Sequence, residues 1–162
     1  MKTRDLVNGW LQSFSQDMGV SQLVFDNNGV CAIRYGDDVE CVLECPTEAE
    51  MVYFYSPMGE VEAFGDGVLR ELLKANLFCL ETHGATFALD TTGSKILLCY
   101  PQPTPLLDET SFRNILVNFL EVSAIWYERL HKPEAFNPSS MQVMNHSKEE
   151  KRWDESSLKH RI

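Results

Sequence analysis

Apolar residues recur along this chain with two periods, and the longer period marks the helices. An amphipathic helix ending near Gly19 is predicted by a four-residue spacing at Leu6, Trp10, Phe14 and Met18. A second helix is expected over about residues 67–77, after an N-cap at Asp66. A third helix is expected to begin after the N-cap Asp108 and to run to about His131, because Pro133 cannot continue it.

The shorter period predicts strands. Turn-forming residues bound these runs, as at Asp26-Asn27-Asn28-Gly29 and in the hairpin signal Thr91-Thr92-Gly93-Ser94. The strands are expected at residues 22–25, 30–35, 39–45, 51–56, 86–90 and 95–100. Because the connections are short, the pattern favours an antiparallel sheet in an α+β fold.

Two of the predicted strands are apolar on both faces, which suggests a second buried surface. The runs at residues 51–55 and 96–100 contain almost no polar side chain, whereas the other strands show the alternation of a sheet with one covered face. One explanation is a central strand covered on both sides within one protomer. The other is a partner chain, and the long third helix favours it because its apolar residues exceed the stripe that faces a core.

The last thirty residues differ in pattern from the rest. Residues 133–145 read as a loose linker, and Ser147-Lys148-Glu149-Glu150 has the form of a capping box for a short charged helix that carries Trp153 and Leu158. We therefore expect one domain over residues 1–132 and a flexible tail, with a possible short helix, over residues 133–162.

Charge and composition narrow the possible partners. The chain has 162 residues, a formal net charge of −10 and a pI near 4.8. Residues 1–131 carry 8 Lys/Arg and 19 Asp/Glu, whereas residues 132–162 carry 6 and 5. This acidity disfavours nucleic acid and anionic membrane surfaces. No apolar run reaches the length of a membrane span, so we expect a cytoplasmic protein without membrane insertion.

The residues that could carry chemistry do not form a recognisable site. Cys41 and Cys45 lie four positions apart on one predicted strand, about 13 Å, which is too far to share a metal ion. Gly65-Asp66-Gly67 lacks the further glycine and lysine of a phosphate loop, and no histidine has a partner at ligand spacing. The sequence therefore predicts no catalytic residues, no metal and no cofactor, but a protein that binds other chains.

The segment from Leu69 to Leu77, with the residues that follow it, carries a family resemblance. The run Leu69-Arg70-Glu71-Leu72-Leu73-Lys74-Ala75-Asn76-Leu77, then two strands and a long C-terminal helix, resembles class I type III secretion chaperones of the CesT (Tir chaperone) family over about Thr3 to His131. The resemblance implies an α-β-β-β-α-β-β-α fold with an antiparallel twisted sheet. It also implies a homodimer in the bacterial cytoplasm that binds the N-terminal region of secreted effectors and keeps it non-globular.

The resemblance also implies two groups of site residues. At the dimer contact it places Leu69, Leu72, Leu73, Asn76, Leu77, Phe87 and Leu89, although some of these leucines could instead face the protomer's own core. For the effector it implies apolar grooves and sheet edges, with Val24, Ile33, Tyr35 and Leu43 as candidates. The tail has no counterpart in the resemblance, and the secretion ATPase or a client is a possible partner for it.

Two other functional classes stay open from the sequence. A non-catalytic adaptor that binds a folded partner would show no preference for unfolded N-terminal segments. A small dimeric enzyme of the hotdog type would need a committed carboxylate or histidine and a long central helix early in the chain.

Overall fold

The expected element order is found in the computed structural model, which describes residues 3–65 and 67–132. Short 3-10 turns lie at Val61–Ala63, Leu77–Cys79 and Thr104–Leu106. The main elements are α1 (Thr3–Asp17), β1 (Val30–Tyr35), β2 (Val39–Glu44), β3 (Met51–Glu60), α2 (Val68–Ala75), β4 (Thr86–Leu89), β5 (Lys95–Pro103) and α3 (Glu109–His131). This order confirms the α+β fold, while the cap expected at Asp66 and the tail lie outside the described residues.

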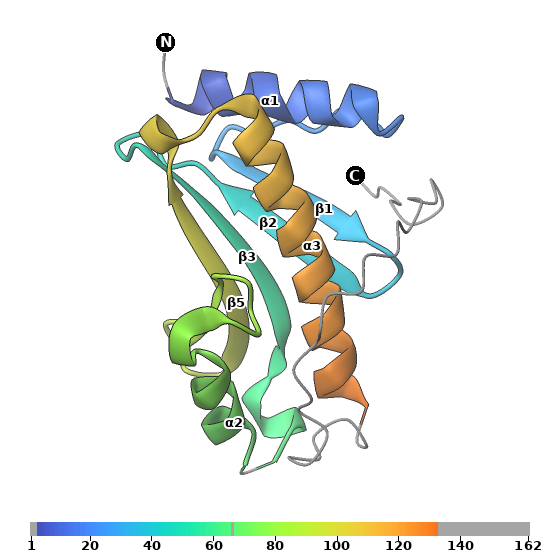
Figure 1. Ribbon diagram of the computed structural model, residues 1–162, viewed down its shortest axis with the longest axis vertical. Coiled ribbons are helices and arrows are strands. Elements are labelled where there is room, and N and C mark those ends of the chain that lie inside the picture. Colours follow the sequence, from blue (N-terminus) through green and yellow to red (C-terminus); the bar gives the residue numbers. More distant parts are fainter. Residues whose placement is uncertain (1–2, 66, 133–162) are drawn as a thin grey trace.

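The five strands form one antiparallel sheet in the order β1-β2-β3-β5-β4. Figure 1 shows α3 lying across one face of this sheet and α1 crossing its end, with α2 beside β5. Strand β3 extends past its predicted end and through Pro57, which is paired with Leu97 of β5. The extension is possible because the pairing of β3 with β2 ends at Tyr55, so the missing N–H of Pro57 breaks no hydrogen bond to β2.

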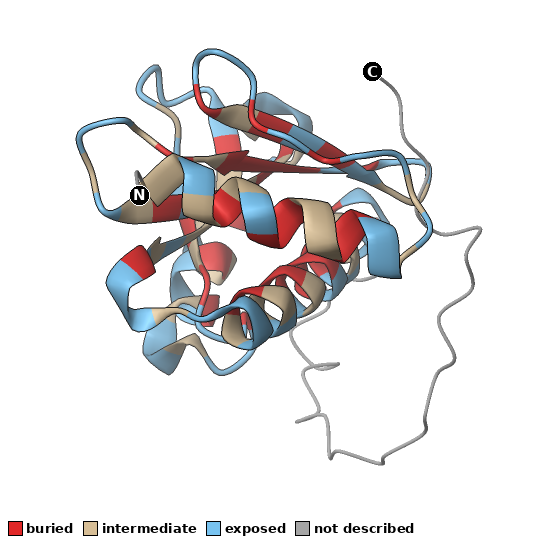
Figure 2. Ribbon diagram, turned by 90° about the horizontal axis from the view of Figure 1, so that it is seen from above, coloured by how far each residue is buried: buried red, intermediate tan, exposed pale blue. Residues whose placement is uncertain are grey.

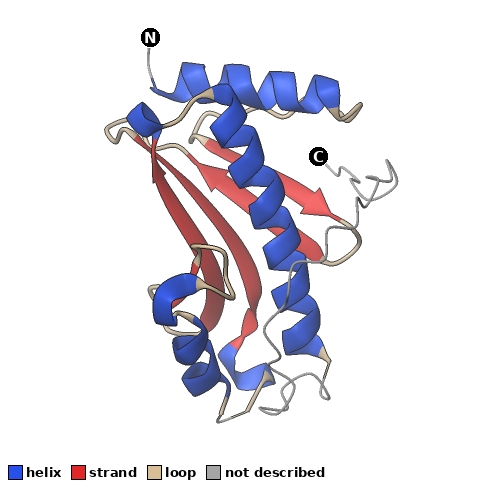
Figure 3. Ribbon diagram, viewed as in Figure 1, coloured by secondary structure: helices blue, strands red, loops and turns tan. Residues whose placement is uncertain are grey.

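The strand predicted at residues 22–25 is wrong, and side chains of α1 explain why. The segment is a loop (Figure 3), although Leu23 and Phe25 are buried and Val24 between them is exposed. The Leu23 N–H donates to the hydroxyl of Ser15, and the Phe25 N–H donates to the amide oxygen of Asn8 at 2.9 Å. Helix side chains therefore satisfy backbone groups that a neighbouring strand would otherwise satisfy.

The core lies between the sheet and the helices (Figure 2), and aromatic rings join the layers. Phe112 of α3 is fully buried, with its ring centroid 5.4 Å from that of Trp10 in α1 and 5.8 Å from that of Phe54 in β3. Further along α3, the indole of Trp126 meets Phe87 of β4 edge-on at 4.8 Å. One helix thus contacts both the N-terminal helix and the far edge of the sheet.

The opposite face of the sheet lacks such cover. On β3, Val52, Phe54 and Met58 are fully buried, whereas Tyr53 is 37% exposed and Tyr55 is half-buried. The run that reads as apolar on both faces therefore has one face in the protomer core and one partly open to solvent. The alternative of a central strand covered on both sides within the protomer is wrong for β3.

Asp108 caps α3 as expected. Its side chain accepts a 2.7 Å hydrogen bond from the Ser111 N–H, and hydrogen bonds from the Ser111 hydroxyl and backbone N–H lower the pKa of the Asp108 carboxyl. A group with a depressed folded-state pKa contributes stability at neutral pH, and this contribution is lost as the pH falls through that depressed value.

We predict that Asp108→Asn folds as stably as the wild type at acidic pH and loses less stability than the wild type on acidification. Asparagine caps about as well as aspartate, but it cannot be protonated in this range. Urea unfolding of both proteins from neutral to acidic pH measures the difference. If the free energy of unfolding falls equally with pH in the two proteins, the Asp108 carboxyl does not contribute to the pH dependence of stability.

Candidate functional site

Six large apolar side chains on α2, in the turn after it and on β4 are exposed or half-buried, and together they are here called the α2 surface. Leu73 is 68% exposed and Phe78 is 81% exposed, values that are unusual for such large apolar residues. The α2 surface consists of Leu69, Leu73, Leu77, Phe78, Leu80 and Leu89. Large apolar side chains left exposed on neighbouring segments of a protein surface mark a binding site for another macromolecule or a ligand.

The helical period divides the residues of α2 between core and surface. Val68, Leu72 and Ala75 are buried, while Leu73 points away from them. Leu72 is 2% exposed and Phe87 is buried against Trp126, so both face the protomer core. Most of the surface of these two side chains is therefore packed within the protomer, and only the part that lines the pocket described below can meet another chain.

The turn after α2 holds its apolar side chains outward in a strained backbone conformation. Phe78 and Cys79 have φ angles of 59° and 51°, in the left-handed region that residues with a Cβ seldom adopt. The Cys79 N–H donates to the Asn76 carbonyl, and the indole N–H of Trp126 donates to the Glu81 carbonyl at 3.1 Å. The surrounding contacts thus fix a costly conformation that exposes Phe78, which is common where such residues serve binding.

Asn76 pairs with β4 in the manner of a neighbouring strand. Its amide nitrogen donates to the Phe87 carbonyl at 3.1 Å, and its amide oxygen accepts from the Phe87 N–H at 2.7 Å. Strand β4 lies at one edge of the sheet, where unpaired backbone groups would attract another strand. The Asn76 side chain therefore occupies this edge at Phe87 and joins the end of α2 to the sheet.

We predict that Asn76→Ala lowers the free energy of unfolding by about 1–3 kcal/mol, because it leaves the N–H and carbonyl of Phe87 without their partners. Thermal unfolding at a fixed protomer concentration measures the loss. Asn118→Ala is the matched control, since Asn118 is an exposed residue of α3. Equal melting temperatures for the two variants would contradict the pairing role of Asn76.

A small apolar pocket opens within the α2 surface. It has a volume of about 130 Å³ and lies between α2 and the strands β4 and β5, lined by Leu69, Leu72, Leu73, Phe87, Ala88, Leu89 and Ile96. Its lining contains no charged side chain. The pocket can accept an apolar side chain from another molecule, but it offers no group for acid–base chemistry.

The residues implied for effector contact divide into two pairs. Ile33 and Leu43 are almost completely buried in the core, so they are not accessible to a client, and the expectation of direct contact there is corrected. Val24 is 49% exposed, and Tyr35, the last residue of β1, is half-buried. Only Val24 and Tyr35 remain as accessible candidates, and both lie near the β1 edge of the sheet.

The cysteines are unreactive where the structure buries them. Cys31, Cys41 and Cys45 are buried, and burial raises the pKa of the Cys31 thiol to about 11. Burial likewise raises the pKa of Cys41, Cys45 and Cys99. A thiol with a raised pKa stays protonated at neutral pH and is a poor nucleophile and a poor metal ligand.

Within residues 3–65 and 67–132, no group of three or more His, Cys, Asp or Glu side chains is arranged to hold a metal ion. In the same part of the chain, none of the helices has both the length and the apolar character needed to cross a membrane.

Phe78 and Leu80 belong to the α2 surface although sequence reasoning did not select them. They follow the helix in the turn Leu77-Phe78-Cys79-Leu80, where the helical period no longer indicates which side chain faces out. The one available signal was the run of large apolar residues immediately before a polar loop.

Comparison with known proteins gives one matching family and several solved structures with a similar fold. A model described as the Tir chaperone protein (CesT) family matches residues 9–127. A search of curated proteins gives no match.

Among solved structures, a chain of the ExsC–ExsE complex is similar at 22% identity and a TM-score of 0.69, covering 80% of this chain and 97% of that one. A chain of the HopA1–SchA chaperone–effector complex gives 20% identity and a TM-score of 0.64, covering 78% and 96%. A chain of the ExoU–SpcU complex from the type III secretion system of Pseudomonas aeruginosa gives 19% identity and a TM-score of 0.56, covering 77% of this chain and 98% of that one. At these identities the likeness shows a shared fold.

Proposed function

We propose a function on the basis of family membership: this chain belongs to the Tir chaperone protein (CesT) family. The protein is a type III secretion chaperone that binds effector proteins. It acts in the bacterial cytoplasm as a homodimer, holds the N-terminal region of an effector in an extended form, and performs no chemistry on it. The observation that carries this proposal is the α2 surface, a patch of large apolar side chains that the protomer leaves uncovered.

The α2 surface is the proposed dimer contact. Leu73, Leu77 and Phe78 would meet their counterparts across a two-fold axis, since a patch of this kind can be self-complementary. Leu69 and Leu89 would border the contact, and the pocket of about 130 Å³ would receive a side chain of the other protomer. Asn76 supports this surface from within, by fixing the end of α2 to β4.

The client is proposed to bind at the β1 edge. The sheet has two edge strands, and Asn76 occupies the β4 edge at Phe87. Among the strands of the described residues, β1 is paired with β2 alone. Asp26 occupies its outer side at Val30, so the added strand would pair with the part of β1 beyond Val30. Val24 and Tyr35 would then contact side chains of the effector segment. The dimer contact and the client edge therefore lie at opposite sides of the sheet.

A dimer with two such edges has a physical advantage for this task. Two stretches of one effector that bind the two protomers raise each other's effective concentration, so two individually weak contacts give a high overall affinity. The net charge of −10 keeps a protein with exposed apolar surfaces from associating nonspecifically. An effector segment held in this way stays extended and suited to a narrow secretion channel. The secretion ATPase remains a possible further partner of the tail.

Capture of effector fragments tests the client preference. The protein is co-expressed with an effector of the same genome, once whole and once without its N-terminal segment. We expect copurification only when the segment is present, and equal capture of the isolated segment. Binding of the folded effector without this segment would instead identify an adaptor for folded partners.

A further inference from the structure

Phe78 is a large apolar residue in a position that the protomer alone does not favour. Its side chain is 81% exposed, and its φ angle of 59° lies in the left-handed region, where glycine is favoured. The indole N–H of Trp126 holds the following loop through the Glu81 carbonyl, so the Phe78 ring projects from a fixed turn. Exposure and backbone strain both cost free energy, and contact with another molecule would offset these costs.

The pocket within the α2 surface has the size and the lining that a phenyl ring requires. Its volume is about 130 Å³, and leucine, isoleucine, phenylalanine and alanine residues form its walls. An apolar cavity of about 150 Å³ with leucine, isoleucine and phenylalanine walls holds one benzene ring. The exposed ring of Phe78 does not fill the pocket of its own protomer. A phenyl ring from another chain can therefore enter it.

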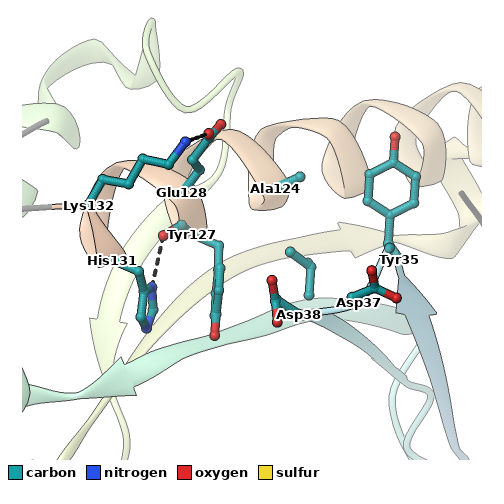
Figure 4. A pocket seen from close by; sticks show the side chains of 10 residues that line it. Tyr35, Asp37, Asp38, Ala124, Tyr127, Glu128, His131 and Lys132 are labelled. Atoms are coloured by element: carbon teal, nitrogen blue, oxygen red, sulfur yellow. Dashed lines mark hydrogen bonds and ion pairs between the residues drawn. The ribbon is translucent and has the colours of Figure 1, made fainter.

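A second pocket, of about 480 Å³, suits such a ring poorly. It lies between the β1–β2 turn and the last turns of α3 (Figure 4), and its lining includes the acidic residues Asp37, Asp38 and Glu128. Glu128 forms an ion pair with Lys132 there. A phenyl ring in this pocket would displace water from charged groups without offering them a hydrogen bond. Of these two pockets, the apolar one at α2 is therefore the better acceptor.

Two-fold symmetry can place the Phe78 ring of one protomer opposite the pocket of the other. In an antiparallel pair of α2 helices centred on Leu73, residues at equal distances before and after Leu73 face each other. At a helical rise of 1.5 Å per residue, Leu69 precedes Leu73 by about 6 Å and Phe78 follows it by about 7–8 Å. Phe78 then faces Leu69 of the partner subunit, and Leu69 lines the pocket. Each protomer supplies one ring and one pocket, so two equal contacts form.

Surface area and charge favour a second copy of this chain as the source of the ring. At roughly 200 Å² for a fully exposed residue of this size, the five exposed residues of the α2 surface present on the order of 600 Å². That is most of the surface, about 800 Å², that each partner buries in a stable interface. Glu71, the acidic residue of α2, is paired with Lys74 at 2.7 Å. Two chains of net charge −10 can therefore meet here without burying an unpaired carboxylate of this helix.

We propose that Phe78 inserts into the α2 pocket of the other protomer and contributes more than any other residue to the affinity of the dimer. This inference rests on the proposed function, since it assumes a dimer through the α2 surface. It adds the register of the two helices, centred on Leu73, and the reciprocal insertion of two rings. Because the pocket is occupied in such a dimer, it is closed to an effector.

Single substitutions test the ring and the pocket separately. Phe78→Gly removes the ring and suits the positive φ, so the turn can keep its conformation. Leu69→Trp fills the pocket from α2, and Leu89→Trp fills it from β4 if the first variant does not fold by circular dichroism. From light-scattering mass in a dilution series, we expect dimerisation to weaken at least about a hundredfold in each variant. Leu106→Ala removes a similarly exposed side chain outside the α2 surface and should leave the dissociation constant unchanged.

A mixture of the two variants tests the insertion most directly. In a heterodimer of Phe78→Gly with Leu69→Trp, the remaining Phe78 meets the one open pocket, and the glycine meets the filled one. Native mass spectrometry of an equal mixture should therefore show at least about tenfold more heterodimer than random pairing gives.

The outcomes separate this inference from the proposed function. Random pairing in the mixture, or a Phe78→Gly variant with wild-type affinity, overturns the insertion even if Leu73→Asp dissociates the dimer as expected. A Phe78→Gly variant that stays dimeric but loses the effector segment would show that the ring serves the client, and it also overturns the insertion. A Leu73→Asp variant that stays dimeric overturns the α2 interface and the insertion together.

Discussion

We expect the Leu73→Asp variant to be a folded monomer. Leu73 is 68% exposed in the protomer, so an aspartate there stays hydrated and costs the isolated fold little. In the proposed dimer two such carboxylates, one from each protomer, are buried without a partner, at a cost of about 3–5 kcal/mol each. That cost weakens association by at least about a hundredfold. Light-scattering mass across a dilution series, together with circular dichroism, measures association and folding separately.

Leu106→Asp is the matched control for this variant. Leu106 is 79% exposed, a value even larger than that of Leu73, but it lies in the short turn Thr104–Leu106 before α3. We expect it to keep the wild-type mass at all concentrations. If Leu73→Asp stays dimeric, or if Leu106→Asp dissociates instead, the dimer interface does not lie at α2.

Phe112→Ala should cause the largest loss of stability among substitutions in the core. The Phe112 side chain is fully buried, and its ring joins Trp10 of α1 to Phe54 of β3. Removal of a buried phenylalanine ring costs about 3–5 kcal/mol, because the surrounding side chains only partly close the cavity. For a domain of this size the melting temperature falls by roughly 10–20 °C.

Denaturant unfolding of Phe112→Ala should be compared with Ile125→Ala at one protomer concentration, since dimerisation also contributes to apparent stability. Ile125 lies on the same helix and is partly exposed, so its truncation should cost far less. Equal losses for the two variants would mean that α1, α3 and the sheet do not share a core at Phe112.

The element order was predictable because local signals specify it. Asp26 and Asp90 each accept backbone N–H groups in the turns where the sequence places hairpin signals. Asp108 begins α3 as its position before an apolar run indicates. These contacts lie within five residues in the chain, so they follow from sequence alone.

The errors arose where long-range contacts decide the outcome. Residues 22–25 alternate like a strand, yet Ser15 and Asn8 of α1 bind their backbone and leave them as a loop. The orientation of α2 is a similar case. Val68, Leu69, Leu72 and Leu73 are apolar around most of the helix, so periodicity could not separate Leu72 in the core from Leu73 on the surface.

The effector candidates show the same limit. Ile33 and Leu43 were selected as apolar residues of early strands, but alternation alone does not tell which face of a sheet the helices cover. The packing of α3 on that face buries both residues. The short α2 also argues against a hotdog-type enzyme, since it has eight residues rather than the length of a central helix.

The central claim is that a dimer of this chain holds the extended N-terminal segment of an effector. Light-scattering mass of the protein copurified with that segment tests it most directly. We predict two protomers of 18.5 kDa with one bound segment, and a dimer of the same two protomers when the segment is absent. A monomer that captures no segment would contradict both the dimer and the chaperone function.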